Sequence, residues 1–187
     1  IYETDFAVES KSDHSPLTQA DLESNNIIVS GLKKHIPEIS ILSEESKDDL
    51  SRLNNTYCFI VDPIDGTKEF VNRNGEFTVN IGLVENGKPI LGVIFAPVLN
   101  KLYFAYHHLG AFVAEVKDYQ IKSKSSISLT NKTNELLIVG SKSHQKEEFK
   151  QLVNQFKQIS NIVSKGSSLK GCMVAEGSAD IYYRFGY

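Results

Sequence analysis

The sequence predicts a mixed α/β fold of layered sheets and helices, with an α+β first unit and an α/β second unit. Two observations predict the layers: apolar runs of strand length recur along the chain, and amphipathic segments with helical periodicity lie before and after them. A third predicts the division. Residues 117–134 are rich in Lys, Ser, Thr and Asn, and they separate a first unit at 1–128 from a second at 129–187.

The first unit opens with a predicted helix over residues 18–36, in which Leu22, Val29, Leu32 and Ile36 share one face and Pro37 ends the run. The apolar segments ISIL (39–42) and YCFIV (57–61) are read as buried strands. After them, Asn86-Gly87 between two apolar runs predicts a β-hairpin, and KLYFAY (101–106) and AFVAEV (111–116) predict two further strands.

The second unit alternates strands and helices. ELLIVGS (135–141) predicts a strand, and residues 144–156 predict an amphipathic helix. Phe149, Leu152, Val153 and Phe156 share one face of that helix. Residues 161–177 then predict a strand, a turn and a helix that ends at Gly177, and ADIYYRF (179–185) predicts a last strand.

Composition excludes several classes of protein. The net charge of −3 and the pI of about 6.0 lack the basic footprint of a nucleic-acid-binding protein. No apolar run has the length of a membrane span, and no signal peptide is expected at this N-terminus. Cys58 and Cys172 have apolar neighbours and no zinc-ligand spacing, so we expect reduced core residues in a cytoplasmic protein.

Acidic residues follow the apolar strand YCFIV in the sequence DPIDGTKEF. Asp62 and Asp65 lie three residues apart on a turn that Pro63 stiffens, with the carbonyl of Ile64 between them. Glu44 follows the other apolar strand and could complete the site. Hard oxygen ligands of this kind suit Mg²⁺ or Mn²⁺. The alternative is that these residues only form turns.

Gly66 and Thr67 come directly after these aspartates and are expected to open a helical turn. The backbone N–H groups at such a turn favour an anionic oxygen near the metals, which indicates phosphoryl chemistry. In the alternative interpretation Thr67 is only a helix cap. Asp21 follows Thr18 by three residues and could likewise only cap its own helix.

The whole stretch DPIDGTKEFVNRNGEFTVNIGLVENGKPILGVIFAPVLNKLYFA closely resembles the D-P-x-D-G-T region of the inositol monophosphatase superfamily. DGTKEF, RNGEFTVNI and GKPILGVIFAPV are similar to its bisphosphate nucleotidase branch. SPLTQAD, LSEES, SKSH and GSSLKGCMVAEGSADIYYRFG also match, in the same order, over essentially all 187 residues. The resemblance implies a layered α-β-α-β-α sandwich of the sugar-phosphatase type.

The resemblance also implies roles for individual residues. Glu44, Asp62, Asp65 and the Ile64 carbonyl would be ligands of two or three Mg²⁺ ions, with Mn²⁺ as an alternative. Thr67, hydrogen-bonded to Asp21, would help to activate the nucleophilic water. The backbone N–H groups of Gly66 and Thr67 would hold the scissile phosphate. The residues implied for the nucleotide and its remaining phosphate are His144, Ser167, Lys170 and Arg184.

Each residue of this second set has a simpler alternative. Lys170 could be an exposed helix charge, Arg184 could face solvent from its strand, and Ser167 and His144 could cap helices. Family members carry W-D-x-A-A shortly after the RFG tripeptide, and its Asp is another metal ligand. That motif is absent from the 187 residues, so we expect the C-terminus to be incomplete.

The implied activity is Mg²⁺-dependent removal of the 3'-phosphate from adenosine 3',5'-bisphosphate, giving AMP and phosphate, in sulfate assimilation. The implied partner is a small phosphonucleotide, with no nucleic acid and no transmembrane segment. A homodimer and a peripheral position on the inner membrane stay open. Two alternative functions also stay open: an inositol monophosphatase or sugar-bisphosphate phosphatase, and a non-catalytic phosphonucleotide-binding module.

Overall fold

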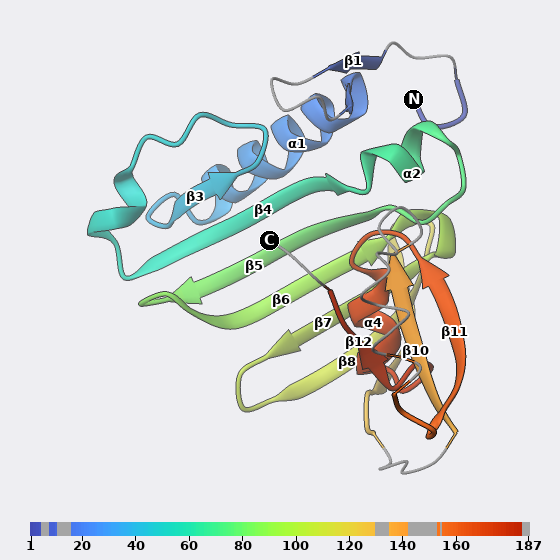
Figure 1. Ribbon diagram of the computed structural model, residues 1–187. Helices are drawn as coiled ribbons and strands as arrows, with labels where there is room; N and C mark the ends of the chain where they lie inside the picture. The colour runs from blue at the N-terminus through green and yellow to red at the C-terminus, as the bar shows by residue number, and fades with distance from the viewer. Residues whose placement is uncertain (5–7, 11–15, 130–134, 142–152, 154, 185–187) are drawn as a thin grey trace.

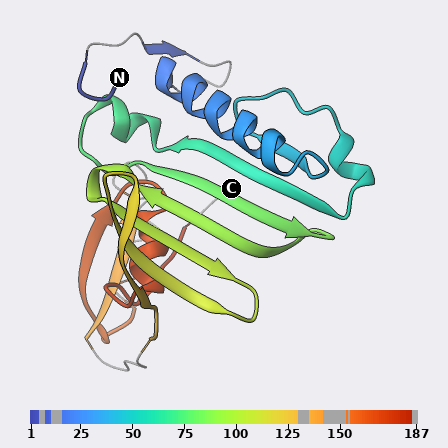
Figure 2. The ribbon, with the colours of Figure 1, turned by 180° about the vertical axis from the view of Figure 1, so that it is seen from behind.

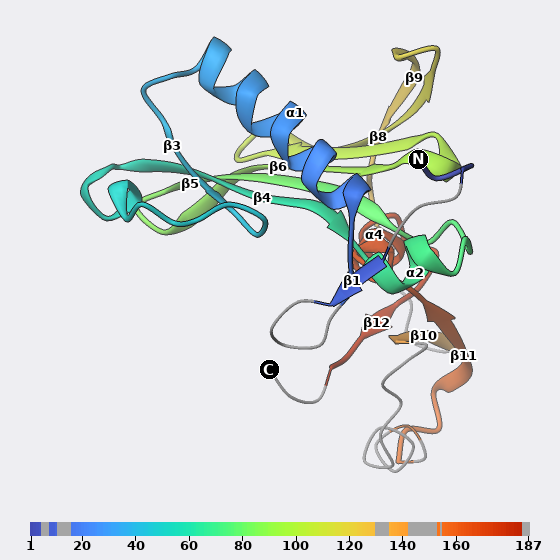
Figure 3. The same cartoon turned by 90° about the horizontal axis from the view of Figure 1, so that it is seen from above.

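The computed structural model describes residues 1–4, 8–10, 16–129, 135–141, 153 and 155–184. Helices and sheets alternate as layers (Figure 3). Helix α1 (Gln19–His35) lies over one face of a seven-stranded sheet, and α4 (Leu169–Ala175) lies between the other face and a three-stranded sheet. The predicted layered α/β sandwich is confirmed. The helix expected at 144–156 falls mostly outside the described residues.

The seven-stranded sheet has the order β3-β4-β5-β6-β7-β8-β9, parallel between β3 and β4 and antiparallel elsewhere (Figures 1 and 2). Its strands are β3 (Ser40–Ser43), β4 (Tyr57–Asp65), β5 (Thr78–Glu85), β6 (Lys88–Ala96), β7 (Lys101–Tyr106), β8 (Gly110–Lys117) and β9 (Gln120–Ser126). Short helices lie between them: η1 (Ser51–Asn54), α2 (Thr67–Val71) and η2 (Pro97–Leu99). A small ladder, β1 (Val8–Ser10) with β2 (Pro16–Thr18), precedes α1.

Turn chemistry fixes the register of the β5–β6 hairpin. Asn86 and Gly87 both have positive φ, 49° and 77°, as a two-residue turn that matches the twist of antiparallel strands requires. Glu85 therefore pairs with Lys88. The hairpin predicted at Asn86-Gly87 is confirmed.

Strand β9 lies within residues 117–134, the predicted boundary between the units, where no strand was predicted. Residues Gln120–Ser126 pair with β8 along the sheet edge, and all seven are exposed. An edge strand that buries no face needs no apolar residues, and lysines there oppose pairing with other chains. Hydrophobic periodicity could not detect it. The two larger sheets divide between β9 and β10, although the division into two units stays a prediction.

The second sheet is parallel, in the order β11-β10-β12, with β10 (Leu136–Ser141), β11 (Ile159–Lys165) and β12 (Ile181–Tyr182). The last strand is shorter than the 179–185 predicted. Val153 is buried against Ile138, as expected for the predicted helix face, but Phe156 is 52% exposed. Phe149 and Leu152 lie outside the described residues.

Helix α1 begins as the sequence predicts. Thr18 is its N-cap in a capping box with Asp21, and the helix ends before Pro37. Its buried residues are Ala20, Asp21 and Asn25, whereas Leu22 is 43% exposed, so the expected apolar face is only partly the buried one. None of the helices among the described residues has the length and apolar character needed to cross a bilayer.

An aromatic cluster anchors the end of β4. Ile64, Phe70 and Phe77 are buried together with Ala20, and Tyr2 packs against them. The rings of Phe70 and Phe77 meet edge to face, with centroids 4.9 Å apart. Because the side chain of Ile64 is fixed in this cluster, the backbone on either side of it is fixed too. Cys58 and Cys172 are buried free thiols, as predicted.

Candidate active site

Two acidic strand ends meet at one edge of the large sheet. Strands β3 and β4 are parallel with Ser43 opposite Val61, so the next residues, Glu44 and Asp62, lie side by side. The backbone N–H of Glu44 donates to the Val61 carbonyl at 3.0 Å, which extends the pairing to this point.

The aspartates of DPIDGT lie within the last residues of β4. Asp62 pairs with Asn80 and Asp65 with Thr78, so three steps along β4 oppose two along β5. Such a shift bends the strand and re-aims its side chains. Pro63, which cannot donate to the ladder, is buried in the bulge. The segment is therefore more than a polar turn: it is a distorted strand end that carries two carboxylates.

Gly66 makes the turn from β4 into α2. Its φ of +92° is one that residues with a side chain rarely adopt. A Cβ there would come within 3.2 Å of Ser167 Cβ, so the turn from β11 to α4 packs directly on it. Thr67 is the first residue of α2, as expected.

Asp21 is the most constrained carboxylate of the candidate set. It is 1% exposed, and its Oδ2 accepts hydrogen bonds from the backbone N–H and the hydroxyl of Thr18, at 2.8 and 2.6 Å. Its Oδ1 accepts the hydroxyl of Thr67 at 3.2 Å, across 46 residues of sequence. The role of Asp21 in capping α1 and its contact with Thr67 therefore do not exclude each other. One carboxylate makes both, with a different oxygen for each.

Asp65 joins the two larger sheets. Its Oδ2 accepts hydrogen bonds from the hydroxyls of Ser167 and Ser168, both at 2.8 Å. Ser167 also lies 2.5 Å from the Thr78 hydroxyl and has a left-handed φ of 55°. The helix cap of α4 is Ser168, without a side-chain capping bond, so the alternative role of Ser167 as that cap is wrong.

Lys170 is not the exposed helix charge of the alternative reading. It is 9% exposed, and its Nζ donates to the Ser167 carbonyl at 2.6 Å and lies 5.7 Å from the centre of the Tyr182 ring. Burial lowers the pKa of Lys170, while the nearby carboxylates of Asp65 and Glu69 oppose that shift. Arg184 is exposed, and His144 lies outside the described residues.

The predicted metal ligands lie at one end of the large sheet, but their side chains do not form a closed cage. Within the described ranges, no three His, Cys, Asp or Glu side chains are grouped closely enough to hold a metal ion. Glu44 is exposed, and Asp65 is turned toward the serines. By donor chemistry alone the set fits a hard divalent cation, since Glu44, Asp62, Asp65 and the Ile64 carbonyl offer only oxygen.

Several residues at this site were not predicted. Ser168, Thr78 and Glu76 all contact the predicted set or the turn that carries it. Glu76 and Thr78 lie in the quoted motif RNGEFTVNI, so the signal was present, but nothing local pointed to their partners. Those partners are about 90 residues further along the chain.

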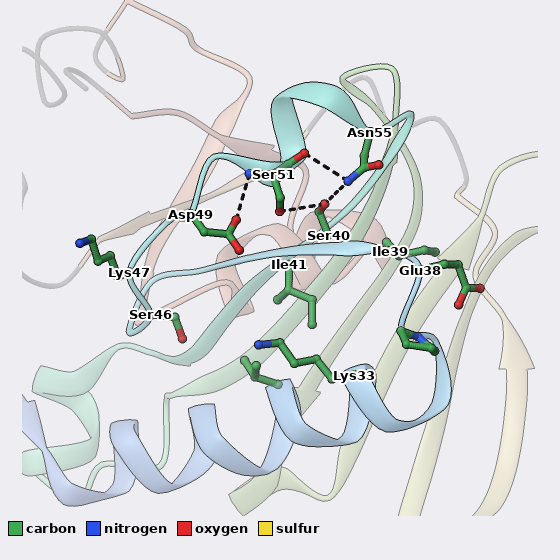
Figure 4. Close-up of a pocket in the computed structure, with 12 residues that line it drawn as sticks. Lys33, Glu38, Ile39, Ser40, Ile41, Ser46, Lys47, Asp49, Ser51 and Asn55 are labelled. Carbon is green, nitrogen blue, oxygen red and sulfur yellow. Dashed lines mark hydrogen bonds between the residues drawn. The ribbon is translucent and has the colours of Figure 1, made fainter.

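A separate cavity of about 460 Å³ lies between α1 and β3 (Figure 4). Lys33 and Val29 line it from the helix, and Ser40 and Ile41 line it from β3, with Asn55 near its rim. None of the predicted site residues lines it. Ser46 and Lys47, two and three residues after Glu44, also line it, although Glu44 itself does not.

Comparison with known proteins extends over the whole chain. The sequence profile of the inositol monophosphatase family matches residues 1–187. The 3'(2'),5'-bisphosphate nucleotidase CysQ of Escherichia coli O6:H1 is 43% identical over 182 residues, covering 96% of this chain and 70% of that protein.

Solved structures show a similarity in fold as well as in sequence. The crystal structure of CysQ from Bacteroides thetaiotaomicron is similar with a TM-score of 0.81 and 38% identity, over 99% of this chain and 73% of that one. An IMPase/NADP phosphatase complexed with Mg²⁺ and phosphate is similar in fold, with a TM-score of 0.74 and 21% identity over 93% of this chain and 64% of that one.

Proposed function

This chain belongs to the inositol monophosphatase family, and from that membership we propose that it is a Mg²⁺-dependent 3'(2'),5'-bisphosphate nucleotidase. It would hydrolyse the 3'-phosphate of adenosine 3',5'-bisphosphate to AMP and phosphate. The 43% identity with the E. coli nucleotidase favours this substrate over inositol phosphates. Clearing this by-product of sulfate assimilation is the role that the likeness suggests.

One observation carries the chemistry: the hydrogen bond of 3.2 Å between Thr67 and the buried Asp21, next to the acidic end of β4. The Thr67 hydroxyl has two acceptors, Asp21 Oδ1 at 3.2 Å and the Ile64 carbonyl at 3.4 Å; when it donates to Asp21, the nearer one, its oxygen can accept a hydrogen bond from a water molecule. Two bonds from Thr18 hold Asp21 still. The pair would therefore orient the attacking water and receive its proton.

The metal would be held by Glu44, Asp62, Asp65 and the carbonyl of Ile64. Bound Mg²⁺ lowers the pKa of a water and neutralises charge on the phosphate oxygens. The aromatic cluster around Ile64 keeps the carbonyl in place, and the bulge aims the two aspartates. The site would hold two or three such ions.

Both units would hold the nucleotide. In the first unit, Gly66 and Thr67 would present N–H groups to the scissile phosphate. In the second unit, Ser167 and Lys170 would bind the phosphate that does not react. Lys170 supports this role because its charge is buried beside the turn that contacts Asp65, where a second anion would compensate it. Arg184 and His144 complete the proposed set.

The cellular setting follows from the same reading. Two buried free thiols suit a cytoplasmic protein, and the substrate is a small phosphonucleotide. A homodimer and peripheral contact with the inner membrane are proposed only as alternatives to a free monomer.

Product analysis tests the function. The protein is incubated with adenosine 3',5'-bisphosphate in the presence of Mg²⁺, and nucleotides and free phosphate are separated and measured. AMP and phosphate in equal amounts, with loss of activity in a chelator, are expected. Binding of the nucleotide without turnover would instead indicate a non-catalytic phosphonucleotide-binding module.

A further inference from the structure

A buried carboxylate ties the two larger sheets together beside the proposed site. Glu76 lies between α2 and β5 and is 9% exposed. Its Oε2 accepts the backbone N–H of Gly166 at 2.9 Å, and its Oε1 accepts Lys165 Nζ at 3.2 Å. Its own N–H donates to Asn74 Oδ1, which fixes the backbone from which the side chain extends. Charge-assisted bonds of this kind are strong when they are buried.

Gly166, in the turn held by Glu76, has no space for a side chain. A Cβ on Gly166 would lie 2.5 Å from Glu69 Cγ and 3.0 Å from the carbonyl oxygen of Glu76. The next residue, Ser167, has a left-handed φ of 55°, which costs energy for a residue with a side chain. Figures 1 and 3 show α2 and the end of β11 side by side at this point. The strained turn persists because its surroundings hold it.

The residues proposed to bind the second phosphate depend on this turn. Ser167 carries the hydroxyl that contacts Asp65 and the carbonyl that accepts Lys170 Nζ. Glu76 fixes the residue immediately before Ser167 through its bond with the Gly166 N–H. A shift of the turn would move the Lys170 ammonium relative to the aspartates of β4.

We infer that Glu76 is a positioning residue that sets the preference for a substrate with two phosphates. It does so by holding Lys165 and Gly166 against the large sheet, so that Ser167 and Lys170 are placed for the phosphate that does not react. This inference rests on the proposed nucleotidase function. It adds to that function a residue that acts through the turn and not on the substrate.

The test compares Glu76→Ala, Glu76→Gln and Gly166→Ala with the wild-type protein. kcat and KM are measured for adenosine 3',5'-bisphosphate and for inositol 1-phosphate. Glu76→Ala should raise KM for the bisphosphate by about tenfold or more relative to its effect on inositol 1-phosphate, as the loss of a charged hydrogen bond implies. Gln keeps an acceptor for Gly166, so Glu76→Gln should recover most of the loss. Gly166→Ala should reproduce the KM effect with every charge intact.

Glu85→Ala is the matched control, because Glu85 is at the other end of β5 and bonds to Tyr57. It should leave both KM values unchanged.

Amide hydrogen exchange gives a second readout that does not depend on activity: the Gly166 amide should exchange faster in Glu76→Ala and regain protection in Glu76→Gln. If wild type fails to hydrolyse the bisphosphate, the proposed function is wrong, and this exchange alone decides whether Glu76 holds the turn. Equal losses for both substrates, or unchanged Gly166 exchange, would overturn the inference.

Discussion

Replacing Thr67 by Val removes one hydroxyl while keeping the shape of the side chain. That hydroxyl donates to Asp21 Oδ1 at 3.2 Å, and Asp21 is 1% exposed, so the carboxylate loses a donor that water cannot easily replace. A buried acceptor left short of a partner costs about 1–3 kcal/mol. The free energy of unfolding should fall by about that amount or less, because Thr18 still donates twice.

Turnover should fall much further than stability. If Thr67 and Asp21 act together on the water, Thr67→Val and Asp21→Asn should each lower kcat by about 10²- to 10⁴-fold, the range for general acid–base catalysis. The double mutant should then be little slower than the slower single mutant, since either change alone disables the pair. The assay is phosphate release at saturating substrate and Mg²⁺, alongside urea unfolding of each variant.

Thr18→Ala is the control for the capping role. It removes the hydroxyl that caps α1 and contacts Asp21 Oδ2, but the backbone N–H of residue 18 still holds that oxygen and the Thr67 contact stays in place. Stability should fall by about 0.5–2 kcal/mol, while kcat stays within about threefold of wild type. Multiplicative losses in the double mutant, with Thr18→Ala slowing turnover as much as Asp21→Asn, would refute the shared role and leave Asp21 as a cap.

Three other outcomes are expected. Asp65→Asn should lower activity by orders of magnitude with folding intact, because it removes a metal-ligand charge; near-normal turnover at saturating Mg²⁺ would exclude Asp65 as a ligand. Lys170→Ala should raise KM for the bisphosphate by about 10- to 150-fold and hardly affect inositol 1-phosphate; equal effects would remove Lys170 from the second phosphate. Burial and its bond to Glu176 raise the pKa of Tyr103 above 10, so the folded protein keeps a proton that the unfolded chain loses. Stability should therefore decline as pH rises above 10, and urea midpoints should show a shallower decline in Tyr103→Phe; an unchanged slope would contradict this.

Local patterns were enough to predict most of the large sheet. The hairpin at Asn86-Gly87 requires two positive φ angles, and the capping box of Thr18 and Asp21 marks the start of α1. Strand β9 could not be predicted, because all of its residues are exposed and its stability comes from pairing with β8.

Part of the candidate site could likewise be predicted from the sequence, and part could not. Asp65 was predicted from its place after a buried strand, and the pairing of Asp21 with Thr67 from the resemblance to a known family; the structure brings these two together across 46 residues. The bonds of Asp65 to Ser167 and Ser168 span more than 100 residues. They depend on the left-handed turn at Ser167, which no local sequence rule requires of a serine.

The most direct test of the account is the ratio of kcat/KM for adenosine 3',5'-bisphosphate to that for inositol 1-phosphate, measured on the protein in the presence of Mg²⁺. We expect the bisphosphate to be preferred and Lys170→Ala to reduce the ratio, because only this substrate has a second phosphate for the buried ammonium to bind. A wild-type preference for inositol 1-phosphate, or a ratio that Lys170→Ala leaves unchanged, would contradict the assignment as a nucleotidase and favour a general phosphatase of the same family.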